Sequence, residues 1–164
     1  MLRIDTGNKY NVFLGSLMNM GNSISTQYDK GFYSNVLIGK GINLGTDTPT
    51  NYGSTVVGNN ASILTSLYAT ALGDSASVKK GYGTAIGQGA TVSLSGNATA
   101  IAIGKGATCW AGIAIGDNAF ETNTQPAPDI TIGSGASNAG GGGSNAVTIG
   151  ASATQMVAGG SATI

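Results

Sequence analysis

The sequence predicts an all-β protein that forms a single-stranded parallel β-solenoid, in which one chain coils repeatedly around a thin core. Three observations support this fold class. A short aliphatic–glycine motif recurs along the chain, apolar and small residues alternate around it, and the composition is poor in charge and rich in small residues. Of 164 residues, 28 are glycine and 9% are charged. Few large apolar side chains are available, so a narrow repetitive core is expected in place of one globular core.

The aliphatic–glycine motif sets the length of the repeat. Between Gly58 and Gly150 its glycines lie 12 to 17 residues apart. Each glycine is expected to allow a positive φ angle or a close approach of backbones at a tight turn. The predicted structural glycines are Gly39, Gly58, Gly73, Gly87, Gly104, Gly116, Gly133 and Gly150.

Residues before each glycine alternate in the manner of a strand with one buried face. A β-branched residue usually stands two positions before the aliphatic residue, and a small residue lies between them. We expect the aliphatic side chains to face inward and Ala85, Ala102 and Ala114 to face outward. The predicted core consists of Ile38, Val57, Leu72, Ile86, Ile103, Ile115, Ile132, Ile149, Ala90, Ala107 and Cys109.

A second strand is predicted after each glycine. Two turn residues lead to an alanine, and an apolar residue often follows two positions later, as at Ile63, Val78 and Val92. Each coil is therefore two short strands joined by a tight turn. One coil cannot bury its own apolar face, so successive coils stack in register with a rise of about 4.8 Å.

The N-terminal segment is less regular than the rest. We expect an irregular cap or virion-attachment segment over residues 1–35 and a β-roll repeat domain over residues 36–164. Arg3, Tyr10 and Phe32 are the candidate docking residues of the first segment. The start of the chain lacks a basic region followed by a long apolar stretch, so no secretory signal peptide is expected.

Three segments rich in proline or glycine interrupt the repeat, at residues 46–52, 121–129 and 137–145. Such residues do not fit interior strands, so these segments are expected to leave the stack as loops. They are either candidate binding loops or tolerated insertions.

The composition excludes most chemistry. Histidine is absent, there is one cysteine, and the formal net charge is zero. We therefore predict no catalytic residues, no cofactor and no metal, and we expect neither nucleic-acid binding nor membrane insertion. Cys109 is expected to be a small buried apolar residue. Two weaker alternatives remain: a glycosidase using Glu121 and Asp129, which bracket one loop, and an ice-binding surface using a threonine row at Thr131 and Thr148.

Three copies of the repeat resemble the head repeats of YadA-like trimeric autotransporter adhesins, which also occur in phage fibres. These copies are residues 84–92 (TAIGQGATV), 102–107 (AIGKGA) and 112–119 (GIAIGDNA). The resemblance implies a left-handed β-roll, a homotrimer, and an adhesive or structural role. The given sequence departs from the adhesin pattern, because it contains neither a heptad run typical of a coiled-coil stalk nor a membrane-barrel anchor. We therefore expect either an excised head or a shorter protein that uses the same module.

The resemblance and these departures together lead to a functional expectation. We expect a trimeric structural or adhesive protein on the virion surface of a bacteriophage: a tail fibre, a head fibre or a capsid-decorating trimer. Its partners would be two further copies, capsid or tail proteins, or a host-cell receptor. The alternative is an adhesin head on a bacterial cell surface that binds a host ligand.

Overall fold

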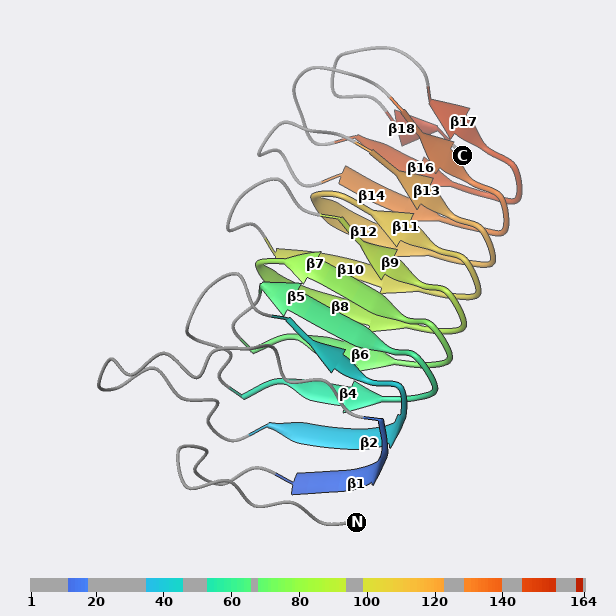
Figure 1. Ribbon diagram of the computed structural model, residues 1–164. Coiled ribbons are helices and arrows are strands. Elements are labelled where there is room, and N and C mark those ends of the chain that lie inside the picture. The colour runs from blue at the N-terminus through green and yellow to red at the C-terminus, as the bar shows by residue number, and fades with distance from the viewer. Residues whose placement is uncertain are drawn as a thin grey trace.

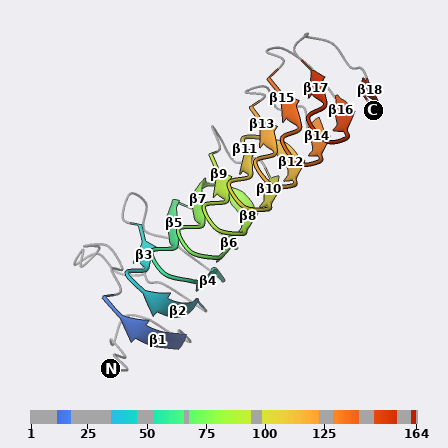
Figure 2. The ribbon, with the colours of Figure 1, turned by 90° about the vertical axis from the view of Figure 1, so that its right-hand side faces the viewer.

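The computed structural model describes residues 12–17, 35–45, 53–65, 68–93, 99–122, 129–139, 146–155 and 162–163. Every regular element in these ranges is a β-strand, and every strand pairing is parallel. The strands form two sheets that rise together along one axis from the N-terminal to the C-terminal end (Figures 1 and 2). The predicted all-β parallel solenoid is therefore confirmed.

The first sheet contains ten strands in the described part of the chain, and it collects the strand that precedes each repeat glycine. Its strands, in spatial order, are β1 (Val12–Ser16), β2 (Val36–Lys40), β4 (Thr55–Val57), β6 (Thr70–Leu72), β8 (Tyr82–Ile86), β10 (Thr99–Ile103), β12 (Gly112–Ile115), β14 (Asp129–Ile132), β16 (Val147–Ile149) and β18 (Ala162–Thr163).

The second sheet contains eight strands, each from the second half of a coil. They are β3 (Asn43–Leu44), β5 (Ser62–Thr65), β7 (Ser77–Lys80), β9 (Thr91–Val92), β11 (Thr108–Cys109), β13 (Phe120–Glu121), β15 (Ser137–Asn138) and β17 (Thr154–Gln155). Each lies beside the corresponding strand of the coils before and after it, which pairs the backbone along the axis.

A tight turn that begins at the repeat glycine joins the two sheets within each coil. At Gly87 the φ angle is +128°, and an added Cβ atom would lie 2.5 Å from the carbonyl oxygen of Gly104 in the next coil. Two residues later, Gly89 has a φ of +65°, and the amide of Ala90 donates to the carbonyl oxygen of Gly87 at 3.2 Å. Glycine is needed at the first position because stacked backbones leave no room for a side chain.

The direction of the side chains in the ten-stranded sheet corrects the expectation from the sequence. Ala85, Ala102 and Ala114, predicted to face outward, are fully buried between the sheets. The aliphatic residue before each repeat glycine faces the outside of the solenoid and is partly exposed; Ile149 is 39% exposed. The residues misplaced in the predicted core are Ile38, Val57, Leu72, Ile86, Ile103, Ile115, Ile132 and Ile149.

The inward positions beside the tight turn hold side chains of different size. Ala102 and Ala107, on either side of the turn at Gly104, both have no exposed surface. Leu37 and Ile42 occupy the equivalent positions beside the turn at Gly39 and are also fully buried. Because side chains alternate along a strand, Ile103 lies on the face opposite to Ala102. Ala90, Ala107 and Cys109 lie in the core.

Several sequence expectations fall at the limits of the described chain. Arg3, Tyr10, Phe32 and residues 46–52 lie outside the described residues. Val12–Ser16, within the segment expected to be irregular, forms β1 and pairs in register with β2. The structure assigns the ends of two predicted loops to strands. Glu121 belongs to β13, Asp129 belongs to β14, and Ser137–Asn138 forms β15. Residues 123–128 and 140–145 of these loops lie outside the described residues. The described residues contain no helix able to cross a membrane.

Candidate functional site: the outer face of the ten-stranded sheet

The outer face of the ten-stranded sheet carries two continuous columns of aliphatic and threonine side chains. We call it the aliphatic face. Strand register aligns each member with its neighbour in the next coil, as for Ile86, Ile103 and Ile115. One column is Val36, Thr55, Thr70, Thr84, Ile101, Ile113, Ile130 and Val147, and the other is Ile38, Val57, Leu72, Ile86, Ile103, Ile115, Ile132 and Ile149.

These side chains are half-buried because each is covered along the axis by its neighbours in the adjacent coils. Their outward surfaces have no cover from the described part of the chain. Neither column contains a charged residue. A continuous apolar surface of this kind is uncommon on a monomeric protein and is typical of an interaction site.

The outer face of the eight-stranded sheet has a different chemistry. We call it the hydroxyl face, and its central column is Ser62, Ser77, Thr91, Thr108, Phe120, Ser137 and Thr154. The hydroxyl of Ser62 donates to Oγ of Ser77 at 3.0 Å, and the hydroxyl of Thr91 donates to the carbonyl oxygen of Gly89 at 3.2 Å. This column is polar enough to stand in water, with Phe120 as its one large apolar member, 41% exposed.

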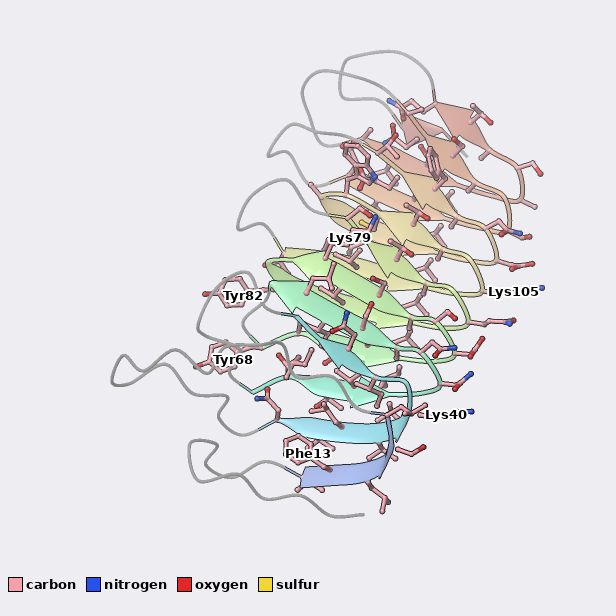
Figure 3. All side chains as sticks on the ribbon, viewed as in Figure 1. Phe13, Lys40, Tyr68, Lys79, Tyr82 and Lys105 are labelled. Atoms are coloured by element: carbon pink, nitrogen blue, oxygen red, sulfur yellow. The ribbon has the colours of Figure 1, made fainter. Side chains whose placement is uncertain are left out.

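The two long edges of the solenoid also differ. Lys40 and Lys105 project from the edge formed by the tight turns, and Tyr68 and Tyr82 lie at the opposite edge (Figure 3). The two tyrosines are 65% and 42% exposed, and their rings stack with centroids 6.3 Å apart. They stand at the margin of the aliphatic face, since Tyr82 begins the outward series of β8 that continues through Thr84 and Ile86.

The turn edge is a solvated surface with no fixed charge pattern. Positions after the repeat glycine include Lys40, Asn59, Asp74, Lys105 and Asp117, all of which are exposed. The amide of Asn59 donates to Oδ1 of Asp74 at 3.2 Å. Exposed contacts of this kind contribute little to stability.

Glu121 has a structural position inside the stack. It is fully buried, and its Oε2 accepts hydrogen bonds from the backbone amides of Trp110 (3.0 Å) and Ala111 (2.9 Å). These amides belong to the short return between β11 and β12. Glu121 therefore stabilises the short segment that leads back to the ten-stranded sheet in the preceding coil. This role explains why a carboxylate occupies a position that other coils fill with Val78 or Val92.

Cys109 donates its thiol proton to the same Glu121 oxygen, over 3.3 Å. Burial raises the pKa of the Cys109 thiol, and the neighbouring Glu121 carboxylate raises it further. The thiol therefore stays protonated across the physiological pH range, and it is neither a nucleophile nor a metal ligand in this state.

Asp129 is also engaged inside the stack. Its Oδ1 accepts from the backbone amide of Ala146 at 2.8 Å, and its Oδ2 accepts from the side-chain amide of Asn138 at 3.1 Å. Both carboxylates suggested by the glycosidase alternative are thus buried and bonded to the protein's own groups. Thr131 and Thr148, suggested by the ice-binding alternative, are fully buried as well, so they form no surface row. In the described ranges, no group of three or more acidic, cysteine or histidine side chains could hold a metal ion.

Sequence reasoning missed Ile101, Ile113 and Ile130 as surface residues, because alternation alone does not say which face is inside. It also missed Glu121, Asn138 and Gln155 as core residues. The sequence did contain a signal for these three core residues. Each lies two positions after the alanine that directly precedes a strand of the eight-stranded sheet.

The parallel stack defines the chain as a β-solenoid repeat protein, with one uncharged aliphatic face. Comparisons with models of known families, with curated proteins and with solved structures found no match for this chain.

Proposed function

We propose that the chain is a non-enzymatic structural module that associates through the aliphatic face into a homotrimer of left-handed β-rolls. The single observation that carries this proposal is the uncharged aliphatic face, which runs through successive coils and which the described residues leave uncovered. Handedness and the number of copies come from the resemblance to YadA-like head repeats.

The length of the face supports self-association. Eight strands, β2 to β16, at the usual strand spacing of about 4.8 Å extend its two columns over roughly 35 Å. A second copy aligned in parallel would make contact along this whole length.

A further copy is the occupant that best fits this face. Its side chains repeat at the strand spacing, so an identical parallel face offers the same periodicity and no unpaired charge. Clustering of three faces around one axis would remove all of them from water and leave the hydroxyl faces outside. The assembly would be a stiff rod with a polar surface.

A stiff polar rod suits a fibre. We propose a tail fibre, head fibre or capsid-decorating trimer of a bacteriophage, placed on the virion surface and attached to capsid or tail proteins. In the described residues the buried carboxylates and the thiol are engaged in structural hydrogen bonds, which favours a structural role over catalysis.

One observation favours the adhesin alternative. Tyr68 and Tyr82 are large aromatic side chains exposed together at one edge, and exposed aromatic residues are enriched at binding sites. An adhesin head is expected to bind a host-surface ligand in a saturable way, and to lose that binding in a Tyr68→Ala/Tyr82→Ala variant. The matched control is Lys40→Ala at the turn edge.

The decisive experiment for assembly is the native molar mass from light scattering coupled to size exclusion. A mass of three chains is expected, and a monomer at all accessible concentrations would contradict the proposal. For the virion role, antibodies against the chain should label intact phage particles. Labelling of bacterial surfaces without phage production would favour the adhesin.

A further inference from the structure

We propose that the C-terminal coils, from Thr99 onward, complete their folding only when a second copy covers them, and that association begins there. The contact that starts it is the isoleucine patch, which we define as Ile101, Ile103, Ile113, Ile115, Ile130 and Ile132. This inference rests on the proposed self-assembly and assigns a different role to each half of the aliphatic face.

The N-terminal coils have a core of their own. Leu37, Leu44, Val56 and Ile63 are large, apolar and without exposed surface. They stack directly on one another along the axis, as Leu37 does on Val56 and Leu44 on Ile63. Burial of large apolar side chains is the main favourable contribution to folding, so these coils gain it within one chain.

The C-terminal coils lack such a core. After residue 99, the buried apolar residues in the described part of the chain are alanines and Cys109. The largest fully buried side chains there are Glu121 and Asn138. In the inner column of the eight-stranded sheet, Val78 and Val92 are followed by Cys109, Glu121, Asn138 and Gln155.

This polar interior costs more to bury than the apolar one. Asn138 and Gln155 have hydrogen-bond partners across the coil, Asp129 at 3.1 Å and Thr148 at 3.3 Å. The hydroxyl oxygen of Thr131 is buried with no partner in the described structure. Satisfied buried polar groups contribute little net stability, and an unsatisfied one destabilises the fold.

The aliphatic face becomes more apolar over the same coils in which the interior becomes more polar. After Val36, the first column of the aliphatic face holds threonine in the N-terminal coils, and it holds isoleucine or valine from Ile101 onward; the second column is aliphatic throughout. The exterior thus gains large apolar side chains where the interior becomes polar. Coils built in this way bury their apolar side chains only when another molecule covers the patch, so folding and association are coupled.

A second copy is the partner that the patch fits. The patch is uncharged, and its two columns repeat from strand to strand, so the same patch on another chain is complementary to it in spacing and in charge. A charged or polar partner would leave its own groups unpaired against six isoleucine side chains.

Hydrogen exchange measured segment by segment, together with the native molar mass, tests this inference. We compare the unmodified chain, an Ile103→Asn/Ile115→Asn variant and a matched Val57→Asn/Leu72→Asn variant of the N-terminal half. In the first variant we expect monomers in which amides of residues 99–155 exchange about tenfold faster or more, while residues 35–65 keep their protection. In the second variant we expect trimers that dissociate at a higher protein concentration than those of the unmodified chain but keep a protected C-terminal half.

Dilution of the unmodified chain provides a test that needs no substitution. As trimers dissociate, protection of residues 99–155 should fall before that of residues 35–65. Dissociated chains whose C-terminal coils stay as protected as in the trimer would overturn this inference while leaving trimer formation intact. Loss of trimers in the Val57/Leu72 variant alone would also overturn it. An unmodified chain that is monomeric at every concentration would instead overturn the proposed assembly.

Discussion

The two outer faces of the solenoid are made by the same repeat, yet one is mainly apolar and the other is mainly polar. Ile103 in β10 and Thr108 in β11 belong to one coil and both point outward. The first lies among Ile86 and Ile115 on the aliphatic face, and the second between Thr91 and Phe120 on the hydroxyl face.

In the proposed assembly, the fold and the association would depend on different residues. The inward residues and the turn glycines determine the coil, and they are common to both sheets. The outward residues are free to vary, and only one sheet uses them to collect apolar side chains. Substitutions on the two faces should therefore separate association from folding.

The largest effect is expected from a charge on the aliphatic face. Ile103→Asp places a carboxylate in each copy at the contact, where an uncompensated buried charge costs about 3–5 kcal/mol. We expect monomers by light scattering. The matched Thr108→Asp variant, one strand away on the hydroxyl face, should remain a trimer; a trimer in both variants would contradict the proposed interface.

A smaller loss of stability is expected from a substitution at a repeat glycine, where the tight turn joins the two sheets. Gly87→Ala would bring a Cβ atom to 2.5 Å from the carbonyl oxygen of Gly104, and we expect a loss of about 3 kcal/mol or more in unfolding free energy. The control is Gly89→Ala, where nothing lies within 4 Å and only the positive φ is unfavourable, at a cost of about 1 kcal/mol. Urea unfolding measures both. Equal losses would show that the close approach of the backbones is not limiting.

The free energy of unfolding at alkaline pH tests whether Cys109 is buried between the two sheets. Burial, followed by the Glu121 carboxylate, raises the pKa of this thiol. The Cys109 thiol of the folded protein keeps its proton above about pH 8.5, whereas the same thiol in the unfolded chain loses its proton there. Stability is thus unaffected below that pH and falls above it, by up to about 1.4 kcal/mol per pH unit.

Comparison with a Cys109→Ala variant separates this effect from the titration of other groups. The variant has no thiol to titrate, so its unfolding free energy should fall less steeply between pH 8.5 and 10. Parallel curves for the two proteins would mean that the thiol is not buried.

The smallest effect is expected on the hydroxyl face. Ser77→Ala removes the hydrogen bond from Ser62 and should cost about 0.5 kcal/mol without changing the molar mass. Leu72→Ala, in the same coil on the aliphatic face, should weaken the trimer by about 1 kcal/mol per copy through lost apolar burial. Sedimentation at several concentrations distinguishes the two, and a weaker trimer in Ser77→Ala would contradict a passive role of the hydroxyl face.

Much of the fold could be predicted from residue spacing. The glycines mark the turns because they recur at a fixed place in each coil, and Ala90, Ala107 and Cys109 were predicted correctly as buried residues. The candidate site was harder to predict. Glu121 sits at an inner position, but nothing in the spacing shows that it accepts hydrogen bonds from the amides of Trp110 and Ala111.

The sequence by itself determined a stacked coil of two short strands with a glycine turn between them, since period, alternation and turn residues are local properties. It did not determine which face of the first strand is inside. Alternation is symmetric, and a shift of one residue reverses every side chain. Tertiary structure decided the question, because the two sheets close on the side that carries Leu37 and Ala102, which have no exposed surface, and the alternate residues such as Ile103 then lie outside.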